Sequence, residues 1–466
     1  MTDLPMGMQT ASAGISYQRV LIVFFALVHG AALLFLTDVR GPQLYDLLSS
    51  TEVTQSADVA SLLLFVGVIP AFFINLQIDR PSKFFALLIY FALYIPCVVI
   101  SPAISDRPLS DFISFLLAIL LSMIVLAFPT LPGRTVLAPF STSRPAYIAA
   151  VAALNLLMLA VCVTRIDIDL TWRPLNEIYD VRETLSDAWL LARDPLLAYS
   201  KQWLMTIAMP ALLALGLLWR RHWATILAVI IAYICYQAFA EKAALANGLA
   251  VGWVFLSMAL SKRIQLDGVI LIGSLIAALT VVFCLDYFFQ ESLLLATWYM
   301  RSFLTPGLLT SFYFDYFTLN PFALFGDSAL GALFGTRASM ENIPLIIGSI
   351  YVYPGCWANA NFWADGYANL GIAGIVLATV VLRLLIAMID ALAVGRDIRV
   401  VIATCTPIVF ALANTALQRA IASNGLWLLI LFVLFLPVDT PTSSADRAND
   451  SPEALPPPAD QVRNPG

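Results

Sequence analysis

The sequence predicts an all-α fold, a polytopic integral membrane protein built as a bundle of about 12 transmembrane helices. Three observations lead to this prediction. Of the 466 residues, 61% are hydrophobic and only 12% are charged, whereas average soluble domains carry about 25% charged residues. The mean hydropathy is +0.87. Apolar runs of the roughly 20 residues that a span needs recur along the chain. These features exclude a soluble globular enzyme, a disordered chain and a disulfide-rich secreted domain.

The first apolar run is interpreted as a membrane anchor. The polar N-terminus lacks the basic segment and small-residue cleavage site of a signal peptide. Eleven further runs are expected to span the bilayer. The runs lie at about 20–37, 59–77, 84–103, 112–129, 146–163, 202–219, 223–240, 244–260, 268–286, 367–390, 400–417 and 423–438.

The orientation follows from the basic residues of the short loops. One alternating set of loops holds ten of them, from Arg80 to Arg399, and the other set holds four. Because cytoplasmic loops are enriched in Lys and Arg, both termini are predicted to be cytoplasmic, in a multi-pass membrane protein. Two long loops, about 164–201 and 287–366, then lie on the opposite face. Residues 1–438 form one membrane domain, and the Pro- and Ser-rich segment 439–466 is predicted to be a disordered cytoplasmic tail.

Several classes of partner and cofactor are excluded by the sequence. The net charge is -5 and no basic stripe occurs, so nucleic acid is not an expected partner. The six cysteines form no C-x-x-C pair and the two histidines lie far apart, so no metal and no other cofactor are expected. Neither a P-loop nor a dinucleotide-binding fingerprint is present. Any chemistry therefore takes place in the membrane or on its outer face, where an activated donor is expected to be lipid-linked.

The two long loops differ in character. The first mixes arginines with carboxylates, and Leu175–Leu191 has the apolar spacing of an amphipathic surface helix, although a solvated charged face is an equal alternative. The second is aromatic-rich but interrupted by Gly, Pro and Asn, which predicts a large outer loop of short half-helices. Its aromatic rings either belong to an interfacial belt or stack on sugar rings.

Arginine is the favoured basic residue, and its planar fork matches phosphate oxygens. Arg301, Arg337 and Arg419 are therefore candidates for holding a diphosphate on the outer face, with ordinary surface ion pairing as the alternative. Since a leaving diphosphate carries much negative charge, cationic side chains can stabilise it.

Two stretches of the second long loop resemble the bacterial oligosaccharide repeat-unit polymerases, the Wzy-type O-antigen and capsule polymerases. The first stretch contains Arg301, Pro306, Gly307, Tyr313, Asp315, Tyr316, Phe317, Asn320 and Pro321. The second runs from Asn359 to Gly371 and contains Asn361, Asp365, Tyr367 and Asn369. The segment with Tyr179 and Arg182 is similar to the first outer loop of that family. The similarity covers about a quarter of the chain.

The resemblance implies an enzyme that polymerises polyprenyl-diphosphate-linked oligosaccharide units on the outer face of the inner membrane. A chain-length regulator is an implied partner, alongside the membrane lipid itself. Asp365 is the favoured general base and Asp315 the second choice. Arg301 and Arg182 are expected to hold the diphosphate, followed by Arg337 and Arg419. The further substrate-contacting candidates are Tyr179, Tyr313, Tyr367, Asn361 and Asn369.

Each of these roles has a structural alternative. Asp365 can instead cap a span that begins near Tyr367, and Asn361 and Asn369 can cap turns rather than bind sugar hydroxyls. Three other activities share the topology. An O-antigen ligase resembles this plan but uses an outer-face histidine, and neither long loop contains one. A glycosyltransferase that uses polyprenyl-phosphate sugars has paired acidic residues in its first outer loop, which are missing here. A lipid-linked glycan flippase needs charged spans, and only His29 and Arg383 lie well inside a run.

Overall fold

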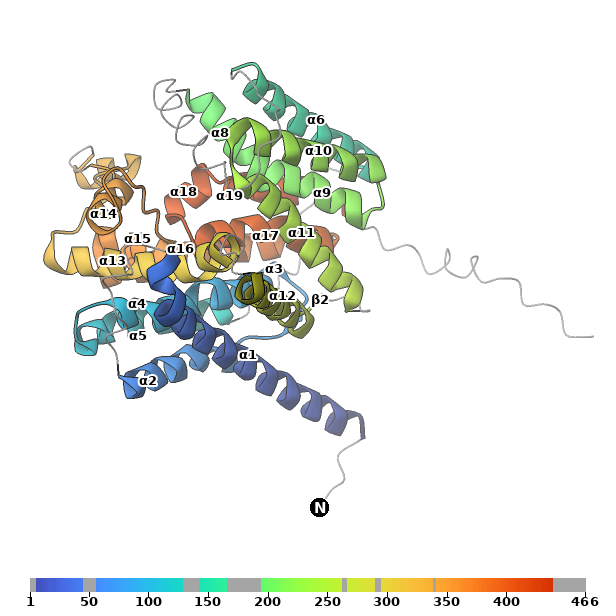
Figure 1. The fold of residues 1–466 in the computed structure, drawn as a ribbon. Coiled ribbons are helices and arrows are strands. Elements are labelled where there is room, and N and C mark those ends of the chain that lie inside the picture. Colours follow the sequence, from blue (N-terminus) through green and yellow to red (C-terminus); the bar gives the residue numbers. More distant parts are fainter. Residues whose placement is uncertain are drawn as a thin grey trace, which may run out of the picture.

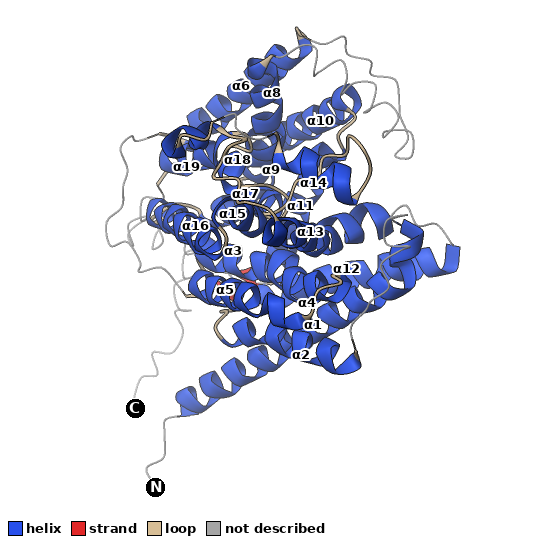
Figure 2. Ribbon diagram, turned by 90° about the vertical axis from the view of Figure 1, so that its left-hand side faces the viewer, coloured by secondary structure: helices blue, strands red, loops and turns tan. Residues whose placement is uncertain are grey.

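The computed structural model describes residues 6–44, 56–128, 142–165, 194–261, 266–289, 295–337 and 341–438. Most of this described part is helical, and its helices are joined by loops and by two short strands (Figure 2). Among the sequence predictions, Tyr179, Arg182, most of the loop 164–201 and the tail 439–466 lie outside the described residues.

The elements follow one another along the chain with few long connections. In order they are α1 (Met6–Leu44), α2 (Ala57–Val68), η2 (Ile69–Phe72), β1 (Gln77–Ile78), α3 (Pro81–Ile89), η3 (Tyr90–Tyr94), α4 (Ile95–Ile104), α5 (Leu109–Ala127), α6 (Arg144–Val163), α8 (Pro195–Trp203), η4 (Leu204–Ala208), α9 (Met209–Leu218), α10 (His222–Phe239), α11 (Lys242–Leu260), β2 (Leu266–Asp267), α12 (Gly268–Phe289), η5 (Leu295–Leu304), α13 (Thr305–Leu319), η6 (Ala329–Phe334), α14 (Ile343–Tyr351), α15 (Phe362–Leu370), α16 (Ile372–Ala393), α17 (Ile398–Leu412), α18 (Leu417–Ala422) and α19 (Leu426–Phe435).

Ten of the described helical segments are long and apolar enough to cross a membrane. They are Tyr17–Thr37, Pro81–Ile104, Leu109–Ala127, Arg144–Val163, Pro195–Leu218, His222–Phe239, Lys242–Leu260, Gly268–Leu285, Ile372–Ala393 and Leu417–Phe435. Two further apolar helices, Asp58–Phe72 and Ile398–Leu412, are shorter. The prediction of an all-α, polytopic membrane protein is confirmed to this extent.

The described ranges contain three π-helical segments, and each ends two residues before a proline. They are η3 before Pro96, η4 before Pro210 and η5 before Pro306. A proline has no N–H for the carbonyl four residues earlier, and its ring crowds that carbonyl. One extra residue in the turn relieves the clash and widens the helix locally. Helices α4, α9 and α13 therefore continue past their prolines.

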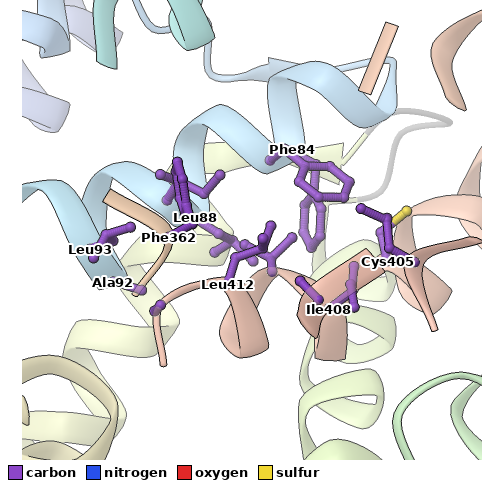
Figure 3. Packing of buried hydrophobic residues seen from close by; sticks show 14 of the residues in the cluster. Phe84, Leu88, Ala92, Leu93, Phe362, Cys405, Ile408 and Leu412 are labelled. Atoms are coloured by element: carbon purple, nitrogen blue, oxygen red, sulfur yellow. The ribbon is translucent and has the colours of Figure 1, made fainter. Parts of the chain in front are cut away.

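The core lies around the continuous segment α3–η3–α4. This segment is apolar on every side, as expected for a helix enclosed by other helices, and its residues are almost all buried. Figure 3 shows Phe84 and Leu88 of α3 beside Ile408 and Leu412 of α17, with Phe362 of α15 close by. The short helices α15 and α17 are thus part of the packed interior.

Connections gather at two ends of the bundle. At one of them, here called the ribbon end, β1 pairs antiparallel with β2. The indole of Trp219 donates to Asp397 at 3.3 Å, and Arg396 forms a single β-bridge with Val438. In Figure 1 this end lies on the right, where β2 is labelled.

The opposite end, here called the loop end, carries α14 and is seen at the left of Figure 1. Arg107, between α4 and α5, forms an ion pair of 2.9 Å with Asp315 of α13. Lys201, in the last turn of α8, pairs with Glu241 of the α10–α11 connection. Segments distant in sequence are therefore joined at this end by charged contacts.

Helix α15 folds back along α16 at the loop end. Gly371, with φ of +62°, separates the two helices, and a left-handed conformation of this kind favours glycine. Trp363 donates from its indole nitrogen to Thr379 Oγ1 at 2.9 Å, which ties the inner part of α15 to α16. The span predicted to begin at Tyr367 begins instead at Ile372, because the apolar run continues through the turn at Gly371.

Helix α13 crosses α4 at close range. A Cβ at Gly307 would lie 2.4 Å from the carbonyl oxygen of Pro96, so only glycine fits there. Ser101 Oγ donates to the Gly307 carbonyl at 2.8 Å. This crossing fixes α13 against the central helix and sets the position of the side chains that follow on it.

Candidate functional site

A charged cluster lies at the loop end, where α15, α18 and the segment after α13 meet. Arg419 of α18 donates from its two terminal nitrogens to Asn359 Oδ1 at 3.1 Å and to Asn342 Oδ1 at 3.3 Å. The second of these nitrogens lies 4.0 Å from Asp327 Oδ2. The arginine side chain is 33% exposed. Because a guanidinium has five N–H donors, part of its fork remains available to a ligand.

Asp365 lies in the first turn of α15 and is partly exposed. Desolvation, the largest cause, raises its pKa from 3.8 to about 7. The neighbouring carboxylate of Asp327 raises the pKa further, whereas Gln418, Arg419 and Asn369 lower it. A carboxyl group with this pKa exchanges its proton near neutral pH, as a general base must.

Asp327 completes the cluster, and the sequence analysis did not single it out. Its side chain is only 5% exposed. One carboxylate oxygen accepts from the Ile343 backbone N–H at 3.4 Å. The other is buried and has no hydrogen-bond partner among the described residues. A Gly-Asp-Ser sequence is typical of an exposed turn, and only the fold places this carboxylate beside Arg419 and Asp365.

A strained turn leads into Asp327. The Gly326 N–H bonds the Ala323 carbonyl at 2.8 Å, while Leu324 and Phe325 between them have φ of +48° and +59°. Non-glycine residues adopt this conformation only where surrounding contacts hold them there. Asn369 supplies such a contact, because its Oδ1 accepts from the Phe325 N–H at 2.7 Å.

Asn369 and Asn361 both have their polar atoms engaged within the protein. Asn369 Nδ2 donates to the Asp365 carbonyl at 2.8 Å. Asn361 caps α15, since its Oδ1 accepts from the backbone N–H groups of the second and third residues after it, at 3.0 and 3.1 Å. Its Nδ2 donates to Thr310 Oγ1 at 2.7 Å. The N-cap of this helix is therefore Asn361, not Asp365, which corrects the alternative role proposed for the aspartate.

The two candidate tyrosines among the described residues are both buried, Tyr313 at 2% and Tyr367 at 8% exposed. Tyr313 is buried on α13, and its hydroxyl donates to the Ala358 carbonyl at 2.9 Å. Burial raises its pKa well above the usual value. The Tyr367 hydroxyl lies 3.2 Å from Thr318 Oγ1, and the Tyr367 ring contacts Phe322 edge to face. Tyr313 thus supports the segment before α15, and Tyr367 adjoins the turn after α13.

Asp315 is engaged elsewhere on α13. Its Oδ1 accepts from Ser105 Oγ at 2.8 Å and from Arg107 Nε at 2.9 Å. Burial is the main cause that raises its pKa, and these two contacts oppose that shift. No hydrogen bond or ion pair of the described residues joins Asp315 to Asp365 or Arg419. The two carboxylates predicted as bases therefore occupy different surroundings.

Arg301, in η5, and Arg337, which follows η6, are both exposed. In the described part of the chain neither side chain has a hydrogen bond or ion pair, so both are available to an anion. Arg337 directly follows Thr336, whose hydroxyl donates to the Leu324 carbonyl at 2.6 Å. It therefore lies close to the strained turn.

The described residues contain no group of three or more His, Cys, Asp or Glu side chains placed to hold a metal ion. No family model, no curated protein and no solved structure matches the chain. The cluster of Asp365, Arg419 and Asp327 is therefore the main feature from which a function can be argued.

Proposed function

We propose that the chain is a polymerase of lipid-linked oligosaccharide repeat units that works on the outer face of a bacterial inner membrane. The observation that carries the proposal is the proximity of Asp365 to Arg419, whose positive charge lowers the pKa of that carboxyl. A partly exposed carboxyl with a pKa of about 7 lies next to a guanidinium whose fork is only partly occupied. Transfer of a glycan from a lipid diphosphate to an acceptor hydroxyl requires two kinds of group, a general base and a cation that stabilises the leaving diphosphate.

We infer that both shorter apolar helices, Asp58–Phe72 and Ile398–Leu412, also cross the membrane, which gives twelve crossings. With twelve, the connections that meet at the ribbon end all fall on one side, and those that meet at the loop end all fall on the other. The ribbon end carries short basic connections with Arg80, Arg220 and Arg396. Because basic loops favour the cytoplasm, the loop end with the charged cluster faces the periplasm in this proposal.

The reaction is a substitution at the anomeric carbon of the growing glycan. An acceptor hydroxyl oxygen forms the new bond to that carbon while Asp365 accepts the hydroxyl proton. The bond from the carbon to the lipid diphosphate breaks, and the diphosphate leaves with the electron pair. Atoms and charge balance without a further reactant, and a base near neutral pKa suits this proton transfer.

The departing diphosphate requires cationic partners. Arg419 is assigned this role because its fork is oriented by Asn342 and Asn359 and is one-third exposed. Arg301 and Arg337 are assigned to the outer phosphate and its approach, since both are exposed and unpaired in the described part of the chain. Asn361, Asn369 and Tyr313 are assigned to positioning, because their polar groups are already bonded within the protein.

Two ionisable groups inside the helices bear on the choice between an enzyme and a flippase. His29 Nε2 bonds the Phe91 carbonyl at 3.0 Å and is only 4% exposed. Arg383 is partly exposed and donates from Nη2 to the Phe128 carbonyl beyond the end of α5, while its Nη1 has no hydrogen-bond partner among the described residues. Two such residues, one of them buried and bonded to the backbone, favour an enzyme over a polar route through the bundle. Because His29 is buried and bonded to the Phe91 carbonyl, it does not serve as the outer-face histidine that a ligase uses.

The test is deletion of the gene followed by gel analysis of the surface glycan. Loss of a polymerase leaves the lipid acceptor capped with single repeat units. Loss of all glycan contradicts the proposal in favour of a flippase or an early transferase, and long polymer retained on its lipid carrier favours a ligase.

A further inference from the structure

A hollow of about 250 Å³ opens beside the charged cluster. It is bounded by the end of α13 and by the segment that follows. Its volume lies below the roughly 300–1,000 Å³ of sites for drug-sized ligands, so it suits a ligand of about one sugar ring. The residues used below are Tyr316, Asn320, Phe322, Leu324 and Thr336.

The lining combines aromatic surface with free polar atoms. Phe322 is 43% exposed and Tyr316 is partly exposed. Asn320 Nδ2 donates to the Tyr316 carbonyl at 2.9 Å. The Oδ1 atom of Asn320 has no partner among the described residues. Ligand sites commonly pair apolar and aromatic walls with a few polar groups that fix orientation. A pyranose ring has the matching surfaces, an apolar face of C–H groups and a rim of hydroxyls.

The hollow and the charged cluster share one structural element. Leu324 of the strained turn lines the hollow, and Asp327 of the cluster follows three residues later. The turn runs from Ala323, which also lines the hollow, to Gly326, and a turn of this type keeps these two Cα atoms within about 7 Å of each other. The Asn369 contact that holds the turn comes from α15, the helix that also carries Asp365. Strain of this kind is retained where the surrounding structure enforces it, commonly at functional sites.

Phe322 connects the two regions through α15. Its ring meets the Tyr367 ring edge to face, with centroids 5.8 Å apart, and Tyr367 lies two residues after Asp365. The ring on which a ligand would stack is thus packed against the same helix that carries the proposed base.

We propose that this hollow is the acceptor subsite, and that it binds the terminal pyranose ring of the acceptor glycan on Phe322 with Asn320 and Thr336 at its rim. The assignment rests on the proposed function, because it supplies the hydroxyl that Asp365 deprotonates. It adds that the terminal sugar of the acceptor is read by the segment 316–336, which ends next to Arg337.

The test measures binding of a free oligosaccharide, apart from turnover. The probe is the repeat-unit oligosaccharide released from its lipid by mild acid, titrated into the full-length protein in nanodiscs and followed by saturation-transfer NMR. Phe322→Ala removes the proposed platform. Phe73→Ala is the matched control, because Phe73 is also 43% exposed and also contacts one other ring, Phe128, near the ribbon end.

The expected result is unchanged binding for Phe73→Ala and a loss of roughly tenfold or more in affinity for Phe322→Ala. Phe322→Leu, which keeps apolar volume but removes the ring, should show an intermediate loss with an unaltered unfolding temperature. Equal binding by all variants overturns the proposed subsite, even if the parent protein makes glycan polymer. A different outcome is that Phe322→Ala loses binding while the parent protein makes no polymer. This outcome supports the hollow as a sugar site but refutes the polymerase proposal. A competition with polyprenyl phosphate is run at concentrations too low to occupy the arginines assigned to the diphosphate. If polyprenyl phosphate then displaces the oligosaccharide, the hollow binds lipid and the inference is overturned.

Discussion

Replacing Asp365 by asparagine tests the proposed base through the pH dependence of the reaction. The pKa of Asp365 is about 7. Between about pH 6 and about pH 8 its ionised fraction rises from roughly one-tenth to nine-tenths, so the initial rate of polymerisation should rise about tenfold. Asp365→Asn should lower the rate at about pH 8 by roughly 10²- to 10⁴-fold, the usual contribution of a general base. It should also remove the rise with pH.

Two neighbouring charges provide directional controls. Arg419→Gln removes a positive charge that lowers the pKa of Asp365, so the rise in rate should move to higher pH. Asp327→Asn removes a negative charge that raises this pKa, so the rise should move to lower pH. The assay is the initial rate of polymer formation from a lipid-linked repeat unit across about pH 5 to 9. A rise with pH that persists in Asp365→Asn, or shifts in the opposite directions, would refute the reasoning.

The same pKa fixes the sign of a stability effect. Folding raises the pKa of Asp365 above its usual value, so the folded state binds a proton more tightly than the unfolded state. The contribution of this proton to the stability of the folded state is complete below about pH 4 and is lost as the pH rises through about 7. Asp365→Asn should therefore unfold at a higher temperature than the parent at about pH 8, and at nearly the same temperature at about pH 4. Equal unfolding temperatures at both pH values would contradict the assigned environment.

Three further substitutions separate binding from structural roles. Arg301→Lys keeps the charge but loses the fork, and should shorten the glycan chains on a gel; unchanged chain length would remove Arg301 from the proposed site. Asn361→Ala loses the α15 cap and the bond to Thr310, and should destabilise the protein by roughly 1–3 kcal/mol in a thermal-unfolding assay. Asp315→Asn breaks the pair with Arg107, and should lower the unfolding temperature without moving the pH profile of the rate, whereas a moved profile would make Asp315 the base.

Much of the fold follows from apolar periodicity and length. Each of the twelve apolar runs overlaps a helix, because a stretch of about 20 apolar residues has few other stable arrangements in a bilayer. The break at Gly371 was not predicted, since the residues on both sides of it are apolar. Hydropathy does not distinguish a helix that crosses from one that turns back along its neighbour. The π-helical segments were also missed, although a proline inside an apolar run is the signal that marks them.

The candidate site was predicted in part. Asp365, Asn369 and Tyr367 lie on one short helix, and the structure brings Arg419 to it from the far end of the chain. Asp327 was not predicted as a site residue, because its effect on Asp365 depends on its burial. A Gly-Asp-Ser sequence does not indicate burial. The detailed roles of the asparagines likewise depend on which backbone groups they meet.

The most direct test of the central claim is reconstitution of the reaction. The purified full-length chain is placed in liposomes with polyprenyl-diphosphate-linked repeat units, and glycan length and released polyprenyl diphosphate are measured together. The proposal predicts a ladder of glycans with one diphosphate released for each bond formed, strongly reduced in Asp365→Asn and in Arg419→Gln but retained in Phe73→Ala. No ladder from the parent protein, or an equal ladder from Asp365→Asn, would contradict it.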